Sequence, residues 1–198
     1  MPYVLYQNYE APQFLTGSVL EFEENIKDIN KGAEIERVHH YGNRKLAENE
    51  IPKVLVLEKK RKTIPAGFLT RSSMFIVNKS VQNFLTELDP DIHQFFPIEV
   101  KYKDGSRPEG EFFVMNVTYK QDSIVDENSS VESFFPPKTD KMKIHHYRKN
   151  VTVQKSVLSN MNIWREERYL KSFLISDSFF EFLNEQKMKF LKSYKTKN

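Results

Sequence analysis

The residues of this sequence best suited to chemistry are four histidines, which occur in two His-His-Tyr segments. The segments are His39-His40-Tyr41 and His145-His146-Tyr147. Imidazole groups can bind a metal ion or transfer protons near neutral pH. Both segments lie in predicted strands, however, and adjacent strand residues point to opposite faces, so neither pair can chelate one ion without a kink. The pattern favours ordinary strand residues, and a hydrolase that uses His145 or His146 stays as an alternative.

Other patterns typical of enzymes are absent from the sequence. There is no cysteine, which excludes disulfides, thiolate metal sites and cysteine nucleophiles. There is also no Gly-x-Ser-x-Gly segment and no glycine-rich phosphate loop. The carboxylate pairs Glu23-Glu24 and Glu166-Glu167 are chain neighbours, whereas the two carboxylates of a glycosidase converge from different elements. We therefore predict no catalytic residue, no bound metal and no cofactor, and a protein that acts by binding.

The net charge of the chain is small, +3 at pH 7. Basic residues gather in Lys59-Lys60-Arg61-Lys62 and among the C-terminal lysines (Lys187, Lys189, Lys192, Lys195 and Lys197). A dedicated nucleic-acid module is usually more basic and more clustered. The first cluster also follows the apolar run Val54–Leu57, as a solvated turn after a strand would. We predict no nucleic-acid partner, and a nucleic-acid-binding module that uses these Lys/Arg clusters stays as the second alternative.

The length and the first residues predict one cytoplasmic domain. A chain of 198 residues suits a single globular domain over residues 1–198. Residues 1–10 have neither the basic region nor the apolar region of a secretion signal. No stretch approaches the ~20 apolar residues of a membrane span, and the absence of cysteine fits a reducing cytosol. We therefore expect a cytoplasmic protein without a membrane partner.

A strand followed by a capped helix occurs twice in the sequence. In the first unit the apolar run Met74–Val77 predicts a buried strand, Asn78 is suited to cap a helix, and apolar residues then recur at helical spacing: Val81, Phe84, Leu85 and Leu88. In the second unit Ser172–Ile175 predicts the strand and Ser176 the cap, and the apolar stripe consists of Phe179, Phe182 and Leu183. Asp89-Pro90 ends the first helix, because the residue before a proline disfavours helix.

The two units align without a gap at an offset of 98 positions, over residues 75–85 and 173–183. Four positions are identical: Phe75/Phe173, Ser80/Ser178, Phe84/Phe182 and Leu85/Leu183. We interpret the match as an internal duplication with pseudo-repeat halves near 1–100 and 101–198. The alternative is that any capped amphipathic helix after a buried strand looks like this.

The remaining segments predict mostly short strands. Two alternating runs, 95–102 and 111–119, are separated by a loop that contains Asp104-Gly105, which predicts an antiparallel hairpin. Further strands are predicted around 3–8, 18–23, 34–40, 53–58, 141–147 and 163–166, and a long loop over 121–140. The fold class that follows is α+β, with mainly antiparallel sheets and two strand-helix units.

In order and spacing, several of these segments resemble the bacterial immunity protein 11 family. The segments that carry the resemblance are Ala66–Leu69, Phe75–Val81, His93–Val100, Phe113–Val117, Ser123–Ser129, Ile163–Arg165 and Phe173–Asp177. The resemblance implies a small cytosolic protein of a polymorphic toxin system, encoded beside a secreted toxin. Such a protein protects the producing bacterium by binding its cognate toxin. It implies no catalytic residues.

Two phenylalanines are the leading candidates for contact with such a partner. If the shared motifs define the scaffold, partner-specific contacts lie in loops and strand ends such as 39–50 and 131–150. Phe134 and Phe135 lie there and adjoin Pro136-Pro137, which would lower the entropy cost of presenting two aromatic side chains. The alternative is that both side chains pin the loop to the core, as most phenylalanines are buried.

Overall fold

The computed structural model of the chain describes residues 2–7, 17–20, 44–70, 74–129, 131–133, 145–147, 151–154, 156, 160–167, 169–186 and 191–197. Within these ranges the α-helices are α2 (Lys79–Leu88) and α3 (Asp177–Glu185), and short 3-10 helices span Glu48–Glu50 and Asp126–Asn128. The strands in the same ranges are β1 (Tyr3–Gln7), β2 (Gly17–Leu20), β3 (Val54–Leu57), β4 (Gly67–Leu69), β5 (Phe75–Asn78), β6 (Gln94–Tyr102), β7 (Phe112–Asn116), β8 (Lys120–Gln121), β9 (Val131–Ser133), β10 (His145–Tyr147), β11 (Ile163–Glu166), β12 (Tyr169–Ile175) and β13 (Leu191–Lys195).

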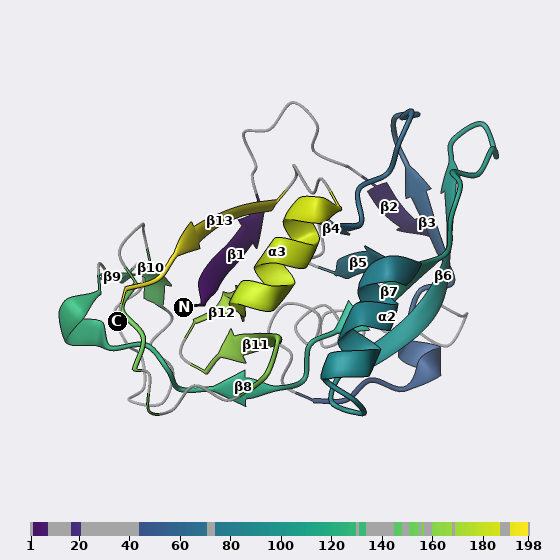
Figure 1. Ribbon diagram of the computed structural model, residues 1–198. Helices are drawn as coiled ribbons and strands as arrows, with labels where there is room; N and C mark the ends of the chain where they lie inside the picture. The colour runs from purple at the N-terminus through teal and green to yellow at the C-terminus, as the bar shows by residue number, and fades with distance from the viewer. Residues whose placement is uncertain are drawn as a thin grey trace.

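The strands form two large sheets and one small sheet (Figure 1). The larger sheet has the order β2-β3-β6-β7-β5-β4, the second β13-β1-β12-β11-β8, and the third pairs β10 with β9. Neighbouring strands are antiparallel except in the pairs β3–β6 and β11–β8. The predicted α+β class with mainly antiparallel sheets is therefore confirmed.

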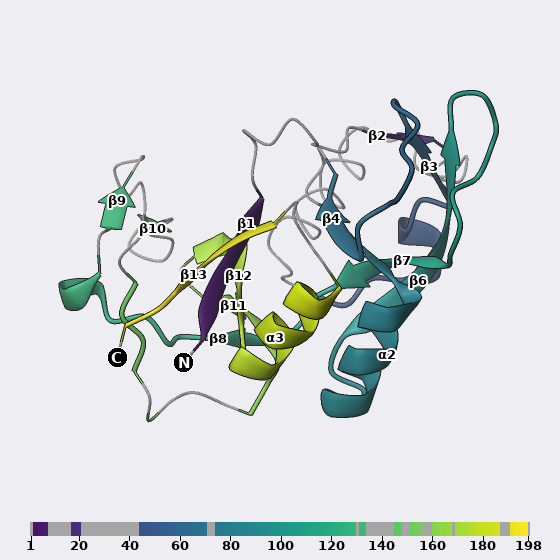
Figure 2. The same ribbon diagram turned by 45° about the horizontal axis from the view of Figure 1, so that its top comes forward.

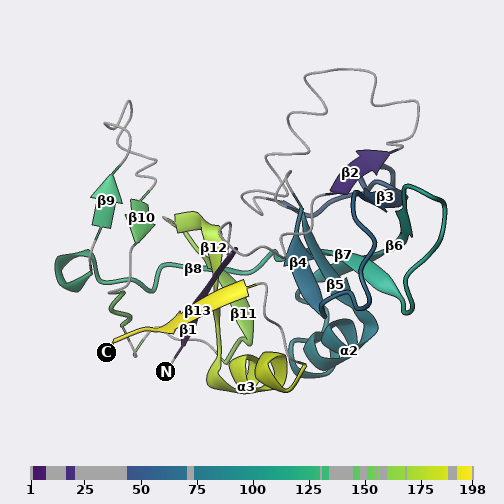
Figure 3. The same ribbon diagram turned by 90° about the horizontal axis from the view of Figure 1, so that it is seen from above.

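Both predicted strand-helix units are present with their predicted caps. The Asn78 side chain accepts a hydrogen bond from the backbone N–H of Val81 (3.1 Å), and the Ser176 hydroxyl accepts one from that of Phe179 (3.1 Å). Each bond satisfies one of the amide groups that the first helical turn leaves without an intrahelical partner. The helices lie side by side on the same side of the molecule (Figures 2 and 3).

The two units also share their sheet topology. The strand order β6-β7-β5-β4 matches β13-β1-β12-β11, with antiparallel pairing at every step. Even the register corresponds, since four residues face one another in a row across each sheet: Leu69, Phe75, Met115 and Phe95 in the first, and Arg165, Phe173, Leu5 and Ser193 in the second. Phe75 and Phe173 are 98 positions apart, and so are Phe95 and Ser193. The offset seen in the sequence therefore extends to β6 and β13.

Equivalent residues of the two units contact each other. The rings of Phe84 and Phe182 stack at a centroid distance of 4.2 Å, and those of Phe75 and Phe173 at 5.1 Å. A residue touches its own symmetry equivalent only close to a two-fold axis. The contacts therefore support the predicted duplication and indicate a pseudo-two-fold axis that runs between α2 and α3. The repeated units do not coincide with the predicted halves near 1–100 and 101–198, because β7 belongs to the first unit and β1 to the second.

Among the described residues, alternation along the strands builds three hydrophobic cores. The inner core draws residues from both large sheets and both helices, among them Leu5, Phe75, Leu85, Phe113, Phe173 and Phe179. The residues between them on the strands point to the opposite faces. Those of the six-stranded sheet pack into a second core that includes Ile76 and Val114, and those of the five-stranded sheet into a third that includes Val4 and Leu174.

The predicted long loop over 121–140 is wrong for its described part. Residues 126–128 form a 3-10 helix, and β9 pairs with β10. The isolated bridge of Ile124 with Val153 also brings this segment into contact with a distant part of the chain. These pairings join distant parts of the chain, which local periodicity does not reveal. The strand predicted at 34–40 lies outside the described residues.

Candidate functional site

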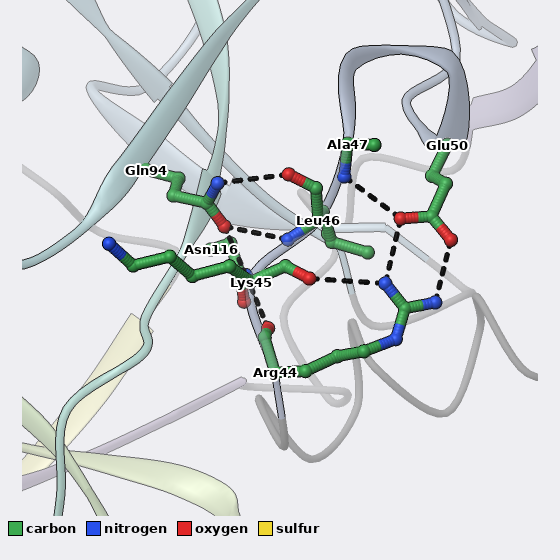
Figure 4. Close-up of polar contacts among 7 residues, drawn as sticks. All are labelled: Arg44, Lys45, Leu46, Ala47, Glu50, Gln94 and Asn116. Atoms are coloured by element: carbon green, nitrogen blue, oxygen red, sulfur yellow. Dashed lines mark hydrogen bonds and ion pairs between the residues drawn. The ribbon is translucent and has the colours of Figure 1, made fainter.

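Three clusters of buried or partly buried polar side chains among the described residues are candidates for chemistry. The first cluster joins the segment 44–50 to the ends of β6 and β7 (Figure 4). Gln94 and Asn116 face each other across the two strands. The Gln94 side chain accepts a bond from the Leu46 N–H (2.8 Å) and donates one to the Leu46 carbonyl (2.9 Å). The Asn116 amide donates to the Arg44 carbonyl (3.0 Å). The two amide side chains thus hold the segment as a neighbouring strand would.

The same segment is closed on itself by an ion pair. Both terminal nitrogens of Arg44 donate to the Glu50 carboxylate, at 2.7 and 2.6 Å, and the Ala47 N–H donates to one of the same oxygens at 2.8 Å. Such two-point pairs fix geometry as well as contributing energy. Leu46 and Ile51 are thereby positioned to pack into the second core, on the outer face of the six-stranded sheet. The cluster is therefore a scaffold contact, since its acid and base are occupied with each other.

The second cluster surrounds Asp89 at the end of α2. The backbone N–H of Asn162 donates to both carboxylate oxygens of Asp89 (3.1 and 2.9 Å), and its side-chain amide donates to one of them (2.9 Å). The Asn162 carbonyl oxygen in turn accepts bonds from the hydroxyls of Ser176 and Ser178, both at 2.8 Å. This chain of bonds connects the last turn of α2 to the start of β11 and to the first turn of α3.

A buried histidine accompanies this carboxylate. His93 Nε2 lies 3.6 Å from Asp89 Oδ2, and both side chains are fully buried. Burial by itself would raise the pKa of Asp89, but the nearby His93 and the bonds from Asn162 outweigh it and hold this pKa below its ordinary value. Neither ring nitrogen of His93 has a hydrogen-bond partner among the described residues. The bonds of this cluster link the end of α2 to the residue before β11 and to the first turn of α3.

The third cluster lies where β8 meets β11. The Glu166 carboxylate accepts bonds from the backbone N–H and the hydroxyl of Ser123, at 2.9 and 2.8 Å. The neighbouring Arg165 is buried, lies over the Phe173 ring at 4.6 Å, and donates to the Val117 carbonyl at 3.2 Å. Burial lowers the pKa of Arg165 to about 9, so the side chain is still protonated at neutral pH. The Val117 carbonyl and the face of the Phe173 ring stabilise its positive charge. This cluster, too, connects strands.

The residues singled out from sequence fall mostly outside the described part of the chain. This holds for Phe134 and Phe135, which stay a prediction, and for His39 and His40. His145 and His146 form part of β10, opposite Ser133 and Glu132 of β9. Within the described residues there is no group of three His, Asp or Glu side chains that could hold a metal ion.

Sequence reasoning missed the polar contacts that connect the units. The sequence alone gives Asp89 a place at the end of the first helix and gives Asn162 no role. The two residues are 73 positions apart, and no local pattern joins them. A weak signal existed, since Asp89 and Asn162 each adjoin a predicted element, where a buried polar side chain can take up the free backbone groups.

Comparison with known proteins identifies the family. Within the described residues, no helix is long and apolar enough to cross a membrane. No match to a curated protein is found. The model of one family, described as Immunity protein family (Imm11), matches residues 15–197. Because the match covers nearly the whole chain, the protein belongs to the Imm11 immunity protein family.

Proposed function

We propose that this protein is a cytoplasmic bacterial immunity protein that neutralises a cognate toxin of a polymorphic toxin system by binding it directly. The observation that carries the proposal is the family match over residues 15–197. The geometry is compatible with it, because the polar clusters built from Arg44 and Glu50, from Asp89 and Asn162, and from Ser123 and Glu166 all hold elements together. The protein contributes a rigid shape and acts without turnover.

We further propose that residues 1–198 act as one domain. The inner core takes side chains from both large sheets and from both helices, and the Asp89–Asn162 bonds connect the first unit to the second. A stable complex buries about 800 Å² on each partner. A scaffold whose two sheets share one core can present such a surface at little cost in conformational entropy.

Co-expression with the product of the adjacent toxin gene tests this function. We expect the tagged immunity protein to retain the toxin in a pull-down and to restore growth to cells that express it, with a stoichiometry of one toxin per immunity protein or a fixed multiple. Restored growth with no retained toxin would contradict neutralisation by binding. Toxin that is released in a covalently altered form would indicate an enzyme instead.

The same assay examines Phe134 and Phe135, which we propose as contacts with the toxin. Replacing both with serine should weaken retention while the melting temperature stays unchanged. A matching fall in melting temperature would assign the two side chains to the core.

A further inference from the structure

Two loops at one end of the six-stranded sheet protrude side by side from the molecule (Figures 1 and 2). They are residues 58–63, which follow β3, and residues 103–111, which connect β6 to β7; together they are called the paired loops. β3 and β6 are parallel neighbours, and their last residues, Leu57 and Tyr102, face each other. The topology therefore makes both loops begin at the same edge of the sheet.

Contacts between the paired loops hold them together. The Tyr102 hydroxyl donates to the Arg61 carbonyl (3.1 Å). Lys60 Nζ lies 3.4 Å from an Asp104 carboxylate oxygen and 5.9 Å from the centre of the Tyr102 ring. These contacts join residues about 40 positions apart in the chain.

The second loop is also closed internally. Asp104 accepts bonds from the backbone N–H and the hydroxyl of Ser106, at 2.9 and 2.6 Å, and these bonds hold the pKa of Asp104 at about 2. The Tyr102 N–H donates to the Ser106 carbonyl (2.8 Å), and Gly105 takes the left-handed backbone that this turn requires, with φ of 81°. Arg107 pairs with Glu99 of β6 at 2.8 Å. A loop tied in this way loses little conformational entropy on binding.

The charge of the paired loops is positive. They contain six basic and four acidic side chains. Asp104 is taken up by Ser106 and Lys60. By contrast, Lys59, Lys62 and Lys103 are exposed, and none of them has a partner among the described residues. What the paired loops offer to a partner is therefore a group of lysines on a fixed backbone.

We propose that the paired loops are a docking surface for an acidic face of the toxin, an inference that rests on the proposed function. Complementary charge accelerates association and fixes the orientation of the partners. A protein fits this surface better than a nucleic acid does. The paired loops also carry the exposed Glu109 and Glu111, which would repel a uniformly negative phosphate backbone. A protein can place acidic side chains opposite the lysines and basic or neutral ones opposite the two glutamates.

The test is a charge reversal with a matched control. The variant Lys59→Glu/Lys62→Glu/Lys103→Glu is compared with Lys45→Glu/Lys195→Glu/Lys197→Glu, which changes the net charge equally at exposed lysines outside the paired loops. The probe is the purified product of the adjacent toxin gene, and the readout is the association rate constant between about 50 and 500 mM salt. We expect the first variant to associate at least about tenfold more slowly at low salt, with a flatter salt dependence, and the control to stay within about threefold of the wild type.

The outcomes separate this inference from the proposed function. If the wild-type protein binds the toxin and both variants lose the same amount, the docking surface is wrong while the function stands. If the wild-type protein does not bind the toxin, the function itself fails. Submicromolar binding of a plain DNA duplex at about 150 mM salt that disappears in the first variant alone would overturn the inference in favour of a nucleic-acid partner. Melting temperatures of both variants near that of the wild type show that the comparison concerns folded protein.

Discussion

At the scale of single residues, several polar side chains of this protein form the hydrogen bonds to backbone groups that a neighbouring strand would otherwise form. Gln94 makes both a donor and an acceptor contact with Leu46, which is how one strand residue would hold another. Asp89 accepts bonds from the backbone N–H and the side-chain amide of Asn162, which directly precedes β11. Because a buried backbone group without a partner is costly, these side chains determine where the segments between the regular elements can lie.

Among these residues, we expect the replacement of Asp89 to lower the stability of the fold most. Asp89→Asn replaces one of two acceptor oxygens by a donor that faces Asn162, and it removes the negative charge beside His93. We expect the free energy of unfolding to fall by about 1–3 kcal/mol, measured by urea denaturation at pH 7. The control is Asp91→Asn, an exposed position with a φ of 57° that asparagine tolerates, and it should stay within about 0.5 kcal/mol of the wild type.

We also expect the difference in stability between the wild type and Asp89→Asn to depend on pH. The pKa of Asp89 in the folded state lies below its ordinary value of 3.8, so its contribution to stability is complete above that ordinary value and is lost as the pH falls through the folded pKa. The difference in unfolding free energy between the wild type and Asp89→Asn should therefore shrink as the pH falls below about pH 4. A difference that stays the same down to pH 2 would show that Asp89 acts through shape alone.

At the scale of elements, the two caps predict unequal effects at equivalent positions. Asn78→Ala removes one bond to the first turn of α2 and should cost about 1 kcal/mol of unfolding free energy. Ser176→Ala removes the corresponding bond in α3 and also the bond to Asn162, so its cost should be larger by about another 1 kcal/mol. Ser80→Ala, at an exposed position of α2, is the control and should change little. Equal losses from both caps would mean that the Ser176–Asn162 bond contributes nothing.

How far the sequence predicts the fold depends on how far apart along the chain the interacting residues are. The strand-helix units were predictable because a cap such as Asn78 and an apolar stripe such as Val81 and Leu85 act within a few residues. The hairpin of β6 and β7 was predictable for the same reason. The parallel pair β3–β6 and the bonds of Asp89 to Asn162 join distant segments, and no periodicity encodes them. The paired loops follow from that parallel pair. The sequence therefore indicates the basic cluster Lys59-Lys60-Arg61-Lys62 but not the surface that it forms with residues 103–111.

At the scale of the whole molecule, the second unit is closed by the other end of the chain. In the first unit β6 continues through residues 103–111 into its neighbour β7. In the second, β13 lies beside β1, which comes from the opposite end of the sequence. Thr196 N donates to the Pro2 carbonyl (3.0 Å), and the N and C marks lie near each other in all three ribbon views (Figures 1–3). β1 therefore occupies in the second unit the position that β7 occupies in the first. No loop connects β1 to β13 as residues 103–111 connect β6 to β7.

This equivalence predicts that the chain ends can be moved from the second unit to the first by circular permutation. In the circular permutant, a short Gly/Ser linker joins Asn198 to Met1, and the chain opens between Glu109 and Gly110, two exposed residues of the 103–111 loop. β13 and β1 then form a continuous hairpin, while β6 and β7 pair across the new ends, so every sheet keeps its order. Termini in exposed loops are tolerated because few contacts are lost there, and we expect native circular dichroism and a melting temperature within about 10 °C of the wild type. The control opens the chain between Asn78 and Lys79, which separates β5 from α2 and breaks the cap, and should not fold. If both permutants unfold alike, the connection through residues 103–111 has a structural role that the junction of β13 and β1 does not share, and the two units are similar in topology without being interchangeable.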